Sequence, residues 1–589
     1  MKDYNKTLWE DNITLVDARK LNNIEEQVDS ITDKLSEVES NLNKNIEAVE
    51  QACTAITGEK FNTIDERIDL EIDRLNKKIE VSMLQQEDKE NHTIDNSVDG
   101  MTTDMIIKGR TLQNLLNQEG YYINPNGSQQ YFHSRKYKNL FKAGKYTLKN
   151  ITGNALIWDI SRKDNDEWIK SIKSNKSIVI ELEEGQYVRN IQALTINGWV
   201  LDESTRKILE HNVVILEGDR LDIINSIDYF EGIKSFGQKE DKINILSHGE
   251  NLLDIKNITN GGSDINTTVQ NDKVIITSLD NSRNWMSSYI VYDLKANTDY
   301  SFKYNAIGSG FIKANIRDFY NDSITYTNDI APDYFRTFRV SKDVKVKIRF
   351  YITGSTGGSF KNEYYNIQLK EGSQDTPYKS YQQDKKDILV KEPLRSIGDF
   401  SDVMYENNKK IKILRNIFIA TLNGQEDIFV NNATPNQNNT MAFAIKNICK
   451  PSSPLICDKF SYVKTTSFDS RDVESITTGG TDMYSLMIRI NRNKLETQNV
   501  AGFRKWLQAN NIITYCVRNT PTTEIVENYE NINLKTYDER TYVSFENTLS
   551  GISSFKAPID TKETLSTLKK ENENIKTILN SILESLNKK

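Results

Sequence analysis

The sequence predicts a mainly β protein with α-helical coiled coils at both ends, arranged as an elongated, parallel homo-oligomer. Three observations support this prediction. Both termini carry heptad ladders of apolar residues, the long middle region consists of short alternating runs typical of β-strands, and part of that region repeats its own layout. At 589 residues the chain is too long for a single core.

The N-terminal 20 residues are expected to attach the protein to a larger particle, with Trp9 as the anchor and Asp11 and Thr14 beside it. The alternative is a frayed end with one local contact. A helix is predicted to begin at Thr14, where Thr14 and Asp17 fit a capping box.

A coiled coil is predicted over residues 21–84. Its seam places Leu21, Val28, Leu35, Leu42, Val49 and Ile56 at heptad position a, and Ile24, Ile31, Val38, Asn45 and Ala52 at position d. So narrow an apolar stripe cannot be buried by one helix alone. Leucine at a with isoleucine at d favours three or four strands over two.

A second coiled coil is predicted over residues 559–589. Asp560 caps its helix, with Glu563 three residues further on. Its seam is formed by Leu565, Leu568, Asn572, Ile575, Leu579, Ile582 and Leu586. The predicted oligomer core therefore includes residues from both ends of the chain.

Between the coils, the apolar period changes from helical to strand-like. We expect a polar linker over 85–104, one β-sandwich module over 105–246, a second β-sandwich module over 247–390, a connector over 391–409 and a β-rich domain over 410–558. The run Phe141 to Thr147 resembles Leu294 to Ser301, which indicates that the two sandwiches are related. A short helix is expected from Val500 to Gln508.

Composition excludes several classes of function. The net charge is −7 and the pI about 5.6, which gives no basic excess for nucleic acid. No apolar run approaches the ~20 residues that cross a bilayer, and the N-terminus lacks the apolar stretch of a signal peptide, so we expect synthesis in a cytoplasm and no membrane insertion. Cys449 and Cys457 are expected to be buried free thiols, and the alternatives are a metal-ligand pair or a disulfide bridge.

No motif indicates catalysis. The four histidines lie in separate contexts, and metalloprotease, serine-hydrolase, P-loop and dinucleotide signatures are all missing from the sequence. We therefore expect no catalytic residues, no metal, no cofactor and no enzymatic activity. A pair of carboxylates suited to glycoside hydrolysis cannot be recognised from sequence, so a glycan hydrolase stays an alternative.

Aromatic residues beside polar ones give the stronger signal. Trp168 follows Asp166 in a predicted turn of the first sandwich, and Trp285 follows Arg283 and Asn284 in the second. Partly exposed rings stack on sugars while neighbouring polar groups bond the hydroxyls, so these five residues are the candidate carbohydrate-binding residues. The alternative for each ring is a place in a sandwich core or between protomers.

Several segments resemble pieces of phage tail proteins. The leader Trp9 to Ala18 with Leu21 to Glu25 is similar to the attachment end of tail-fibre and baseplate proteins of phages that infect Gram-positive bacteria. The segments Lys108 to Leu116, Tyr229 to Gly237 and Gln368 to Tyr378 resemble recurring parts of phage minor structural proteins.

The resemblance implies a homotrimeric fibre of tandem jelly-roll or β-sandwich modules, located in a virion or a phage-tail-like bacteriocin. It also implies that the module over 247–390 is similar to carbohydrate-binding modules. Its N-terminus would contact baseplate or tail proteins, and its modules would bind host surface glycans as a receptor-binding protein. The alternatives are a non-adhesive baseplate or connector protein and a tail-associated hydrolase.

Overall fold

The computed structural model divides the chain into two compact units, residues 1–78 and 79–589. It describes residues 25–26, 28–38, 40, 81–116, 121–123, 130–150, 155–193, 209, 211–221, 224, 227, 229–278, 286–353, 359–431, 439–464, 472–566, 569–570, 573 and 576–577. Among the described residues, no helix is both long and apolar enough to cross a membrane.

The first unit is described only where it is helical. Residues 28–38 form a helix, as the heptad pattern predicts, with Val28 and Ile31 half-buried and Leu35 exposed. Most other predicted residues of the two seams and the leader lie outside the described residues, namely Leu21, Ile24, Leu42, Asn45, Val49, Ala52, Ile56, Leu568, Asn572, Ile575, Leu579, Ile582, Leu586, Trp9, Asp11 and Thr14.

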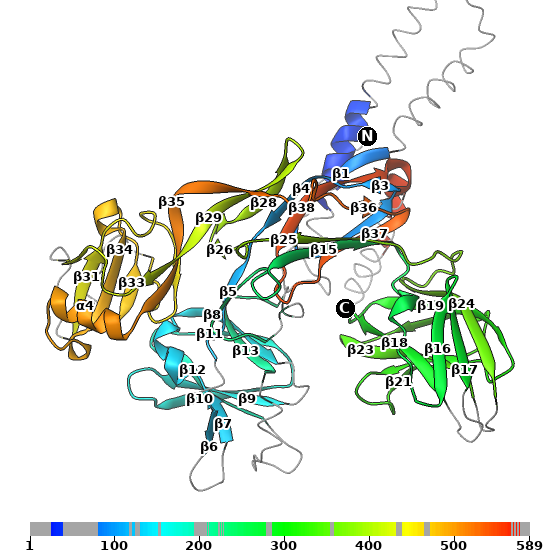
Figure 1. Cartoon of the computed structure of the whole chain (residues 1–589), viewed down its shortest axis with the longest axis horizontal. Helices are drawn as coiled ribbons and strands as arrows, with labels where there is room; N and C mark the ends of the chain where they lie inside the picture. The colour runs from blue at the N-terminus through cyan, green and yellow to red at the C-terminus, as the bar shows by residue number, and fades with distance from the viewer. Residues whose placement is uncertain are drawn as a thin grey trace, which may run out of the picture. The chain divides into compact units, whose positions relative to one another are not determined.

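The second unit is mainly β, as predicted, and its largest element is an 11-stranded sheet, here called the central sheet (Figure 1). Its strand order is β25-β15-β37-β2-β38-β4-β28-β29-β35-β32, with β1 also paired to β38. The strands are β1 Val81–Lys89, β2 His92–Ser97, β4 Thr103–Lys108, β15 Lys242–His248, β25 Gln383–Leu389, β28 Val403–Asn407, β29 Lys410–Leu422, β32 Leu455–Cys457, β35 Ile512–Val526, β37 Glu539–Phe545 and β38 Ile552–Asp560.

The central sheet joins the two ends of the second unit. β2 pairs with β37, and β4 pairs with β38. Their apolar side chains share one core, which includes Ile94, Ile107, Val543 and Phe555. The side chain of His92 bonds the backbone oxygen of Ser553, 461 residues away, at 2.9 Å.

The expected linker at 85–104 is wrong. These residues form most of β1, all of β2 and β3 (Gly100–Met101), and the start of β4. Strand β2 reads His-Thr-Ile-Asp-Asn-Ser and places one aliphatic side chain in the core, so its alternation is hidden in the sequence. The predicted coil is also too long, because Val81 to Leu84 pair with β38 as a strand.

Three small two-stranded sheets accompany the central sheet. They pair β3 with β36, β5 with β14, and β26 with β27. Their remaining bounds are β5 Thr111–Gln113, β14 Ile233–Ser235, β26 Ser396–Ile397, β27 Phe400–Ser401 and β36 Lys535–Thr536.

Module 1, drawn in cyan, is a β-sandwich inserted between β5 and β14 (Figure 1). Sheets β10-β9-β12-β7-β6 and β11-β8-β13 enclose a core that contains Trp158, Tyr146 and Tyr187. Its elements are β6 Tyr121–Ile123, β7 Gln130–His133, the 3-10 helix η2 Arg135–Leu140, β8 Gly144–Asn150, β9 Leu156–Arg162, β10 Trp168–Ser174, β11 Ile178–Leu182, β12 Gln186–Ala193 and β13 Val213–Glu217.

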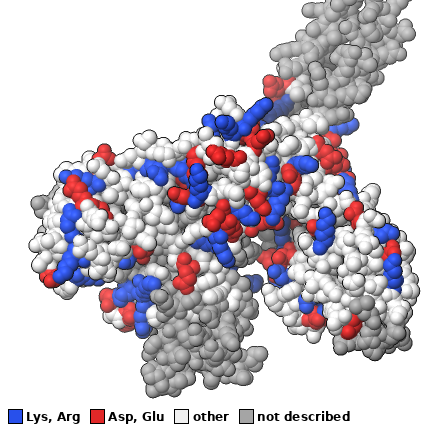
Figure 2. Space-filling model, in the orientation of Figure 1, with Lys and Arg blue, Asp and Glu red and all other residues white. Residues whose placement is uncertain are grey.

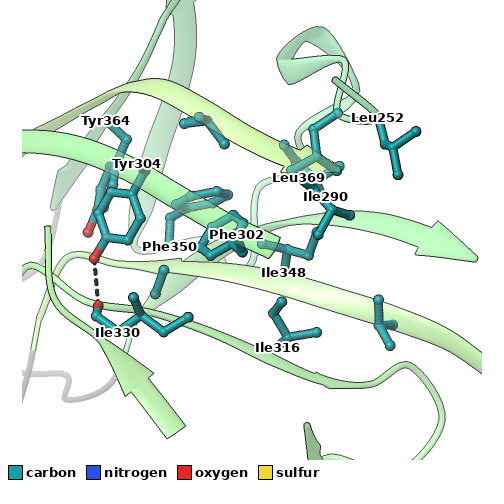
Figure 3. Close-up of a cluster of buried hydrophobic side chains, with 14 of the residues drawn as sticks. Leu252, Ile290, Phe302, Tyr304, Ile316, Ile330, Ile348, Phe350, Tyr364 and Leu369 are labelled. Carbon is teal, nitrogen blue, oxygen red and sulfur yellow. Dashed lines mark hydrogen bonds between the residues drawn. The ribbon is translucent and has the colours of Figure 1, made fainter. Parts of the chain in front are cut away.

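Module 2, drawn in green, is a second sandwich, inserted between β15 and β25. Sheets β16-β17-β24-β19-β22 and β18-β23-β20-β21 enclose its aromatic core, where the Tyr304 hydroxyl donates to the oxygen of Ile330 at 2.7 Å (Figure 3). Its elements are η4 Ile255–Asn257, β16 Ile265–Gln270, β17 Lys273–Ser278, β18 Ser287–Leu294, β19 Asp299–Gly308, β20 Ala314–Asp318, β21 Thr325–Ile330, β22 Arg336–Arg339, β23 Val344–Tyr351 and β24 Lys361–Glu371.

Module 3 lies in the chain between β29 and β35, and β32 pairs with β35. The sheet β30-β31-β34-β33 and helix α4 share a core with the far ends of β29 and β35, including Phe443, Phe503 and Cys516. Its remaining elements are β30 Ile428–Val430, β31 Thr440–Ile445, β33 Ser475–Thr477, η5 Asp482–Tyr484, β34 Leu486–Asn491, η6 Arg492–Lys494 and α4 Val500–Ala509, the last of which confirms the predicted helix.

Modules 1 and 2 share two buried hydrogen-bond arrangements, the first at an asparagine and the second at a tyrosine. The side-chain oxygen of Asn114 accepts the backbone N–H groups of Leu116 and Ile215, both at 3.0 Å. Asn251 repeats this with Leu253 and Leu369, at 3.2 and 3.3 Å. Each amide therefore ties the start of a sandwich to its last strand.

The second arrangement is made by a buried tyrosine, which occupies equivalent positions in the two copies of the sequence repeat. The hydroxyl of Tyr146 accepts the N–H of Lys142 at 2.7 Å, and that of Tyr300 accepts the N–H of Lys295 at 2.8 Å. Both rings lie in their sandwich cores. The shared geometry supports the predicted relation between the two modules.

Cys449 is not a free thiol, which corrects the expectation. It forms a disulfide with Cys516, 67 residues away, with the Cα atoms 5.3 Å apart inside the module 3 core. Cys457 is free and buried, as expected, and burial raises the pKa of its thiol to about 12. The sequence concealed the pairing because the two cysteines meet only through tertiary structure.

Replacing Asn251 with alanine should destabilise module 2 by about 3 kcal/mol, because it leaves several buried backbone groups without partners. Hydrogen exchange followed by mass spectrometry should show faster exchange in β24 and unchanged exchange in module 1. The control is Asn321→Ala, which removes one exposed turn bond. Equal protection of β24 in both variants would contradict the role of Asn251.

Candidate carbohydrate-binding faces

The five-stranded sheet of module 1 has one apolar and one polar face. In β9, Leu156, Trp158 and Ile160 point into the core, while Asp159 and Ser161 lie on the opposite face because side chains alternate along a strand. Trp158, an aromatic residue of this module, is therefore a core residue. The opposite face is here called the outer face of module 1.

Trp168 begins β10 and lies at the end of the β9–β10 hairpin. A β-bulge between Trp168 and Lys170 interrupts the register with β9, which redirects the tryptophan relative to the strand. Its side chain is 60% exposed. The indole is therefore presented to solvent, although burial of its two flat faces would be favourable.

A hydrogen-bond chain holds this exposed ring. The indole N–H of Trp168 donates to Ser171 Oγ at 3.1 Å, and the hydroxyl of Ser171 donates to Asp159 Oδ1 at 2.7 Å. Asp159 is buried and lies directly across from Ser171 in the ladder. The ring is thus fixed by the sheet beneath it, which lowers the entropy lost when a ligand stacks on it.

Two amides border the same carboxylate. Gln192 and Asn190 of β12 point their nitrogens at Asp159 Oδ2, at 3.4 and 3.5 Å, since a carboxylate can only accept. Their side-chain oxygens are buried and without a hydrogen-bond partner. Gln192 is more than nine-tenths buried. Because buried polar atoms are normally hydrogen-bonded, its side-chain oxygen is expected to accept a hydrogen bond from a ligand hydroxyl or a water.

Asp166 lies in the turn before Trp168 and has a left-handed backbone, φ 59°. Its carboxylate accepts the Tyr187 hydroxyl at 2.7 Å, and Arg135 and Lys138 lie 3.4 and 3.7 Å away. Partial burial would raise its pKa, but the Tyr187 bond and the cationic neighbours hold the pKa of Asp166 below its ordinary value. In this arrangement Asp166 shapes the turn that carries Trp168.

Trp285, Arg283 and Asn284 lie outside the described residues. They directly precede β18, an edge strand of the four-stranded sheet of module 2. On the face of that sheet away from the core, Tyr289 of β18 lies opposite Arg349 of β23, which lies opposite Asn315 of β20. The side chains on this face are here called the outer face of module 2.

The outer face of module 2 combines rings, cations and an amide. The Lys347 ammonium lies 5.6 Å from the centre of the Tyr289 ring and 5.1 Å from that of Phe319. Arg349 forms an ion pair with Asp322. Asn315 donates to Asp329 at 3.0 Å and to the Tyr351 hydroxyl at 3.1 Å, and its own oxygen has no partner.

Sequence reasoning singled out Trp168 but missed Asp159, Ser171, Asn190 and Gln192. The available signal was the polar residue Asp159 between two apolar residues of a strand, Trp158 and Ile160, within Ile-Trp-Asp-Ile. Gln192 and Asn190 carry a weaker signal, because the bulge between Val188 and Asn190 breaks the alternation.

The distribution of charged side chains on the surface shown in Figure 2 does not indicate a particular class of ligand. Lysine and arginine alternate with aspartate and glutamate over the face shown in Figure 2. Within the described ranges, no group of three or more histidine, cysteine or acidic side chains is placed to hold a metal ion. The polar and aromatic outer faces are thus the more distinctive features.

Comparisons with known proteins name no family. No protein-family model and no curated protein matches the chain. The solved structures that align include one titled "Structure of infectious bursal disease virus Gt strain", at 8% identity and a TM-score of 0.10, covering 81% of this chain and 82% of that one. A VP2 subviral particle of the same virus aligns at 10% identity and a TM-score of 0.09, covering 81% of each chain.

The turn at Asp166 should make module 1 sensitive to acid. Because the folded pKa of Asp166 is depressed, its stabilisation is present above the unfolded pKa, about 3.9, and is lost as the pH falls through the folded value. Asp166→Asn should cost about 1 kcal/mol at pH 7, and its difference from the native protein should vanish once the pH has fallen below the folded pKa of Asp166.

Urea unfolding at several pH values, followed by the hydrogen-exchange protection of β9 and β10, checks this. The exposed Asp164 bonds only the adjacent N–H of Asn165 in the described contacts, so Asp164→Asn is the matched control. A pH-independent loss in Asp166→Asn would contradict the assigned role of the charge.

Proposed function

We propose that this chain is a homotrimeric tail fibre of a phage or phage-tail-like particle that adheres to host surface glycans through its β-sandwich modules. The single observation that carries the adhesive part is the exposed indole of Trp168, fixed by Ser171 and Asp159 beside two unpartnered amide oxygens. A sugar offers an apolar ring face to the indole and hydroxyl groups to the oxygens.

The second outer face supports multivalent binding. Tyr289, Lys347 and the buried Asn315 lie together on the outer face of module 2, and Trp285 precedes β18 in the sequence. Two modules on each of three chains would give several weak sites at high effective concentration, so avidity could hold a cell without tight single sites.

Exposed seam residues support the homotrimer. Leu35 is 47% and Val38 is 55% exposed on the helix of residues 28–38. Leu565, the first seam residue of the C-terminal helix, is exposed as well, and Asp560 caps that helix through the N–H of Glu563 at 2.9 Å. Apolar ladders left in water by one chain are what copies of a coiled coil bury.

Attachment to the particle is assigned to the leader, with Trp9, Asp11 and Thr14 as the contact residues, by its resemblance to tail-fibre and baseplate proteins. In this role the fibre is synthesised in the host cytoplasm and located in the virion or bacteriocin tail. No catalytic step, metal or cofactor is part of the proposal.

Trp168→Ala should weaken binding of the full chain to purified Gram-positive cell-wall glycans by tenfold or more, since about 1.4 kcal/mol of lost stacking is a factor of ten. Biolayer interferometry measures the change. Tyr334→Ala removes an equally exposed ring from outside both outer faces and serves as the control. Equal binding by both variants would remove Trp168 from the site.

Electron microscopy of intact particles, labelled with an antibody to module 1, distinguishes the proposal from a connector role. We expect label at the outer end of a tail appendage. Label confined to the interior of the baseplate, with no binding on a glycan array, would identify a structural connector. Release of reducing sugars from purified cell walls would identify a hydrolase.

A further inference from the structure

Strand β1 is exposed to a degree that is unusual for a strand of a large sheet. Eight of its nine residues are exposed, on both faces of the strand, and the ninth, Gln86, is half-buried. It pairs with β38 and with no second strand among the described residues. Its other edge therefore presents open backbone N–H and C=O groups.

The exposed residues of β1 divide into two halves. Val81 is 56%, Met83 44% and Leu84 43% exposed. The other half ends in Glu87, Asp88 and Lys89, and Asp88 forms an ion pair with Lys108. Charged residues discourage pairing at one end of an edge strand, so the apolar half, Val81–Leu84, is the part open to a partner.

The position of this apolar half indicates the partner. The register of the β1–β38 ladder places Val81 directly opposite Asp560. Asp560 is the cap of the C-terminal helix, and Val81 begins the strand that replaces the last four residues of the predicted N-terminal coil. Both predicted self-association elements therefore join the second unit at one end of one strand pair.

This convergence makes a second copy the expected occupant. If copies wind together through either coil, each brings its Val81–Asp560 pair close to the axis of association. Burial of apolar side chains there would remove the exposed surface of Val81, Met83 and Leu84 from water, which is favourable. A different protein would have no such reason to meet β1 at this point.

We propose that the apolar half of β1, Val81–Leu84, is a contact surface between copies of this chain, at the point where both predicted coiled coils join the β-rich unit. The inference rests on the homotrimer of the proposed function and adds a β-mediated interface to it. Every copy contributes the same strand, so the three apolar halves would meet around the axis of the homotrimer.

Cysteine labelling of the full chain tests the contact. In a Cys53→Ser background, Leu84→Cys and Val81→Cys each place a thiol in the apolar half of β1. Val473→Cys, at a similarly exposed apolar residue of module 3, is the matched control. The rate of reaction with a maleimide is measured on the native protein, and sedimentation equilibrium gives the mass of the same samples.

A trimeric mass with labelling at positions 81 and 84 at least tenfold slower than at 473 supports the contact. A trimeric mass with equal labelling rates would overturn the β1 interface while leaving the homotrimer intact. A monomeric mass would overturn the homotrimer and this interface together. Two variants are used so that one poorly folded substitution does not decide the result.

Discussion

Closure of the central sheet is the constraint on which the β-rich unit depends. Strands β2 and β4, near the beginning of the unit, pair with β37 and β38, near its end. The three modules are inserted in the chain between these two pairs of strands. The shared core of Ile94, Ile107, Val543 and Phe555 is apolar and fully enclosed. Because this core draws on both ends of the unit, no module can be displayed correctly unless those ends meet.

Buried polar groups determine how each insertion joins this sheet. Asn114 and Asn251 close the two sandwiches, as described above. At module 3, the carboxylate of Asp402 accepts the N–H groups of Asn416 and Ile417 at 2.8 and 3.0 Å, where a bulge interrupts β29. Arg415 pairs with the same carboxylate at 3.3 Å and with Glu524 at 3.0 Å. The Asp402 carboxylate accepts backbone N–H groups that the strand pairing leaves without partners. Removal of Asp402 or Arg415 would leave the remaining buried groups without hydrogen-bond or ion-pair partners.

Local patterns in the sequence predicted local structure well. The β-rich middle, helix α4, the helical residues 28–38 and the relation of modules 1 and 2 all follow from periodicity, capping or repeated motifs. The central sheet did not follow from these patterns, because pairing over more than 400 residues leaves no short-range signal and β2 has little apolar alternation. The link between Cys449 and Cys516 was missed for the same reason.

The candidate site was predicted in part. A tryptophan that follows polar turn residues can be recognised in the sequence, and Trp168, which is exposed, was identified in this way. The support beneath it comes from neighbouring strands: Asp159 and Ser171 meet across β9 and β10, and Gln192 arrives from β12. Strand order and the position of a bulge decide that meeting, and neither can be read from the residues alone.

The amides at Asn114 and Asn251 have a consequence for how such chains diversify. Each closes its sandwich at the base with bonds to backbone atoms, largely independent of the side chains around the rest of the module. A gene encoding this architecture could therefore exchange one sandwich for another by recombination at those two boundaries. The recognition surface could change with the host while the framework that carries it kept the same pairing.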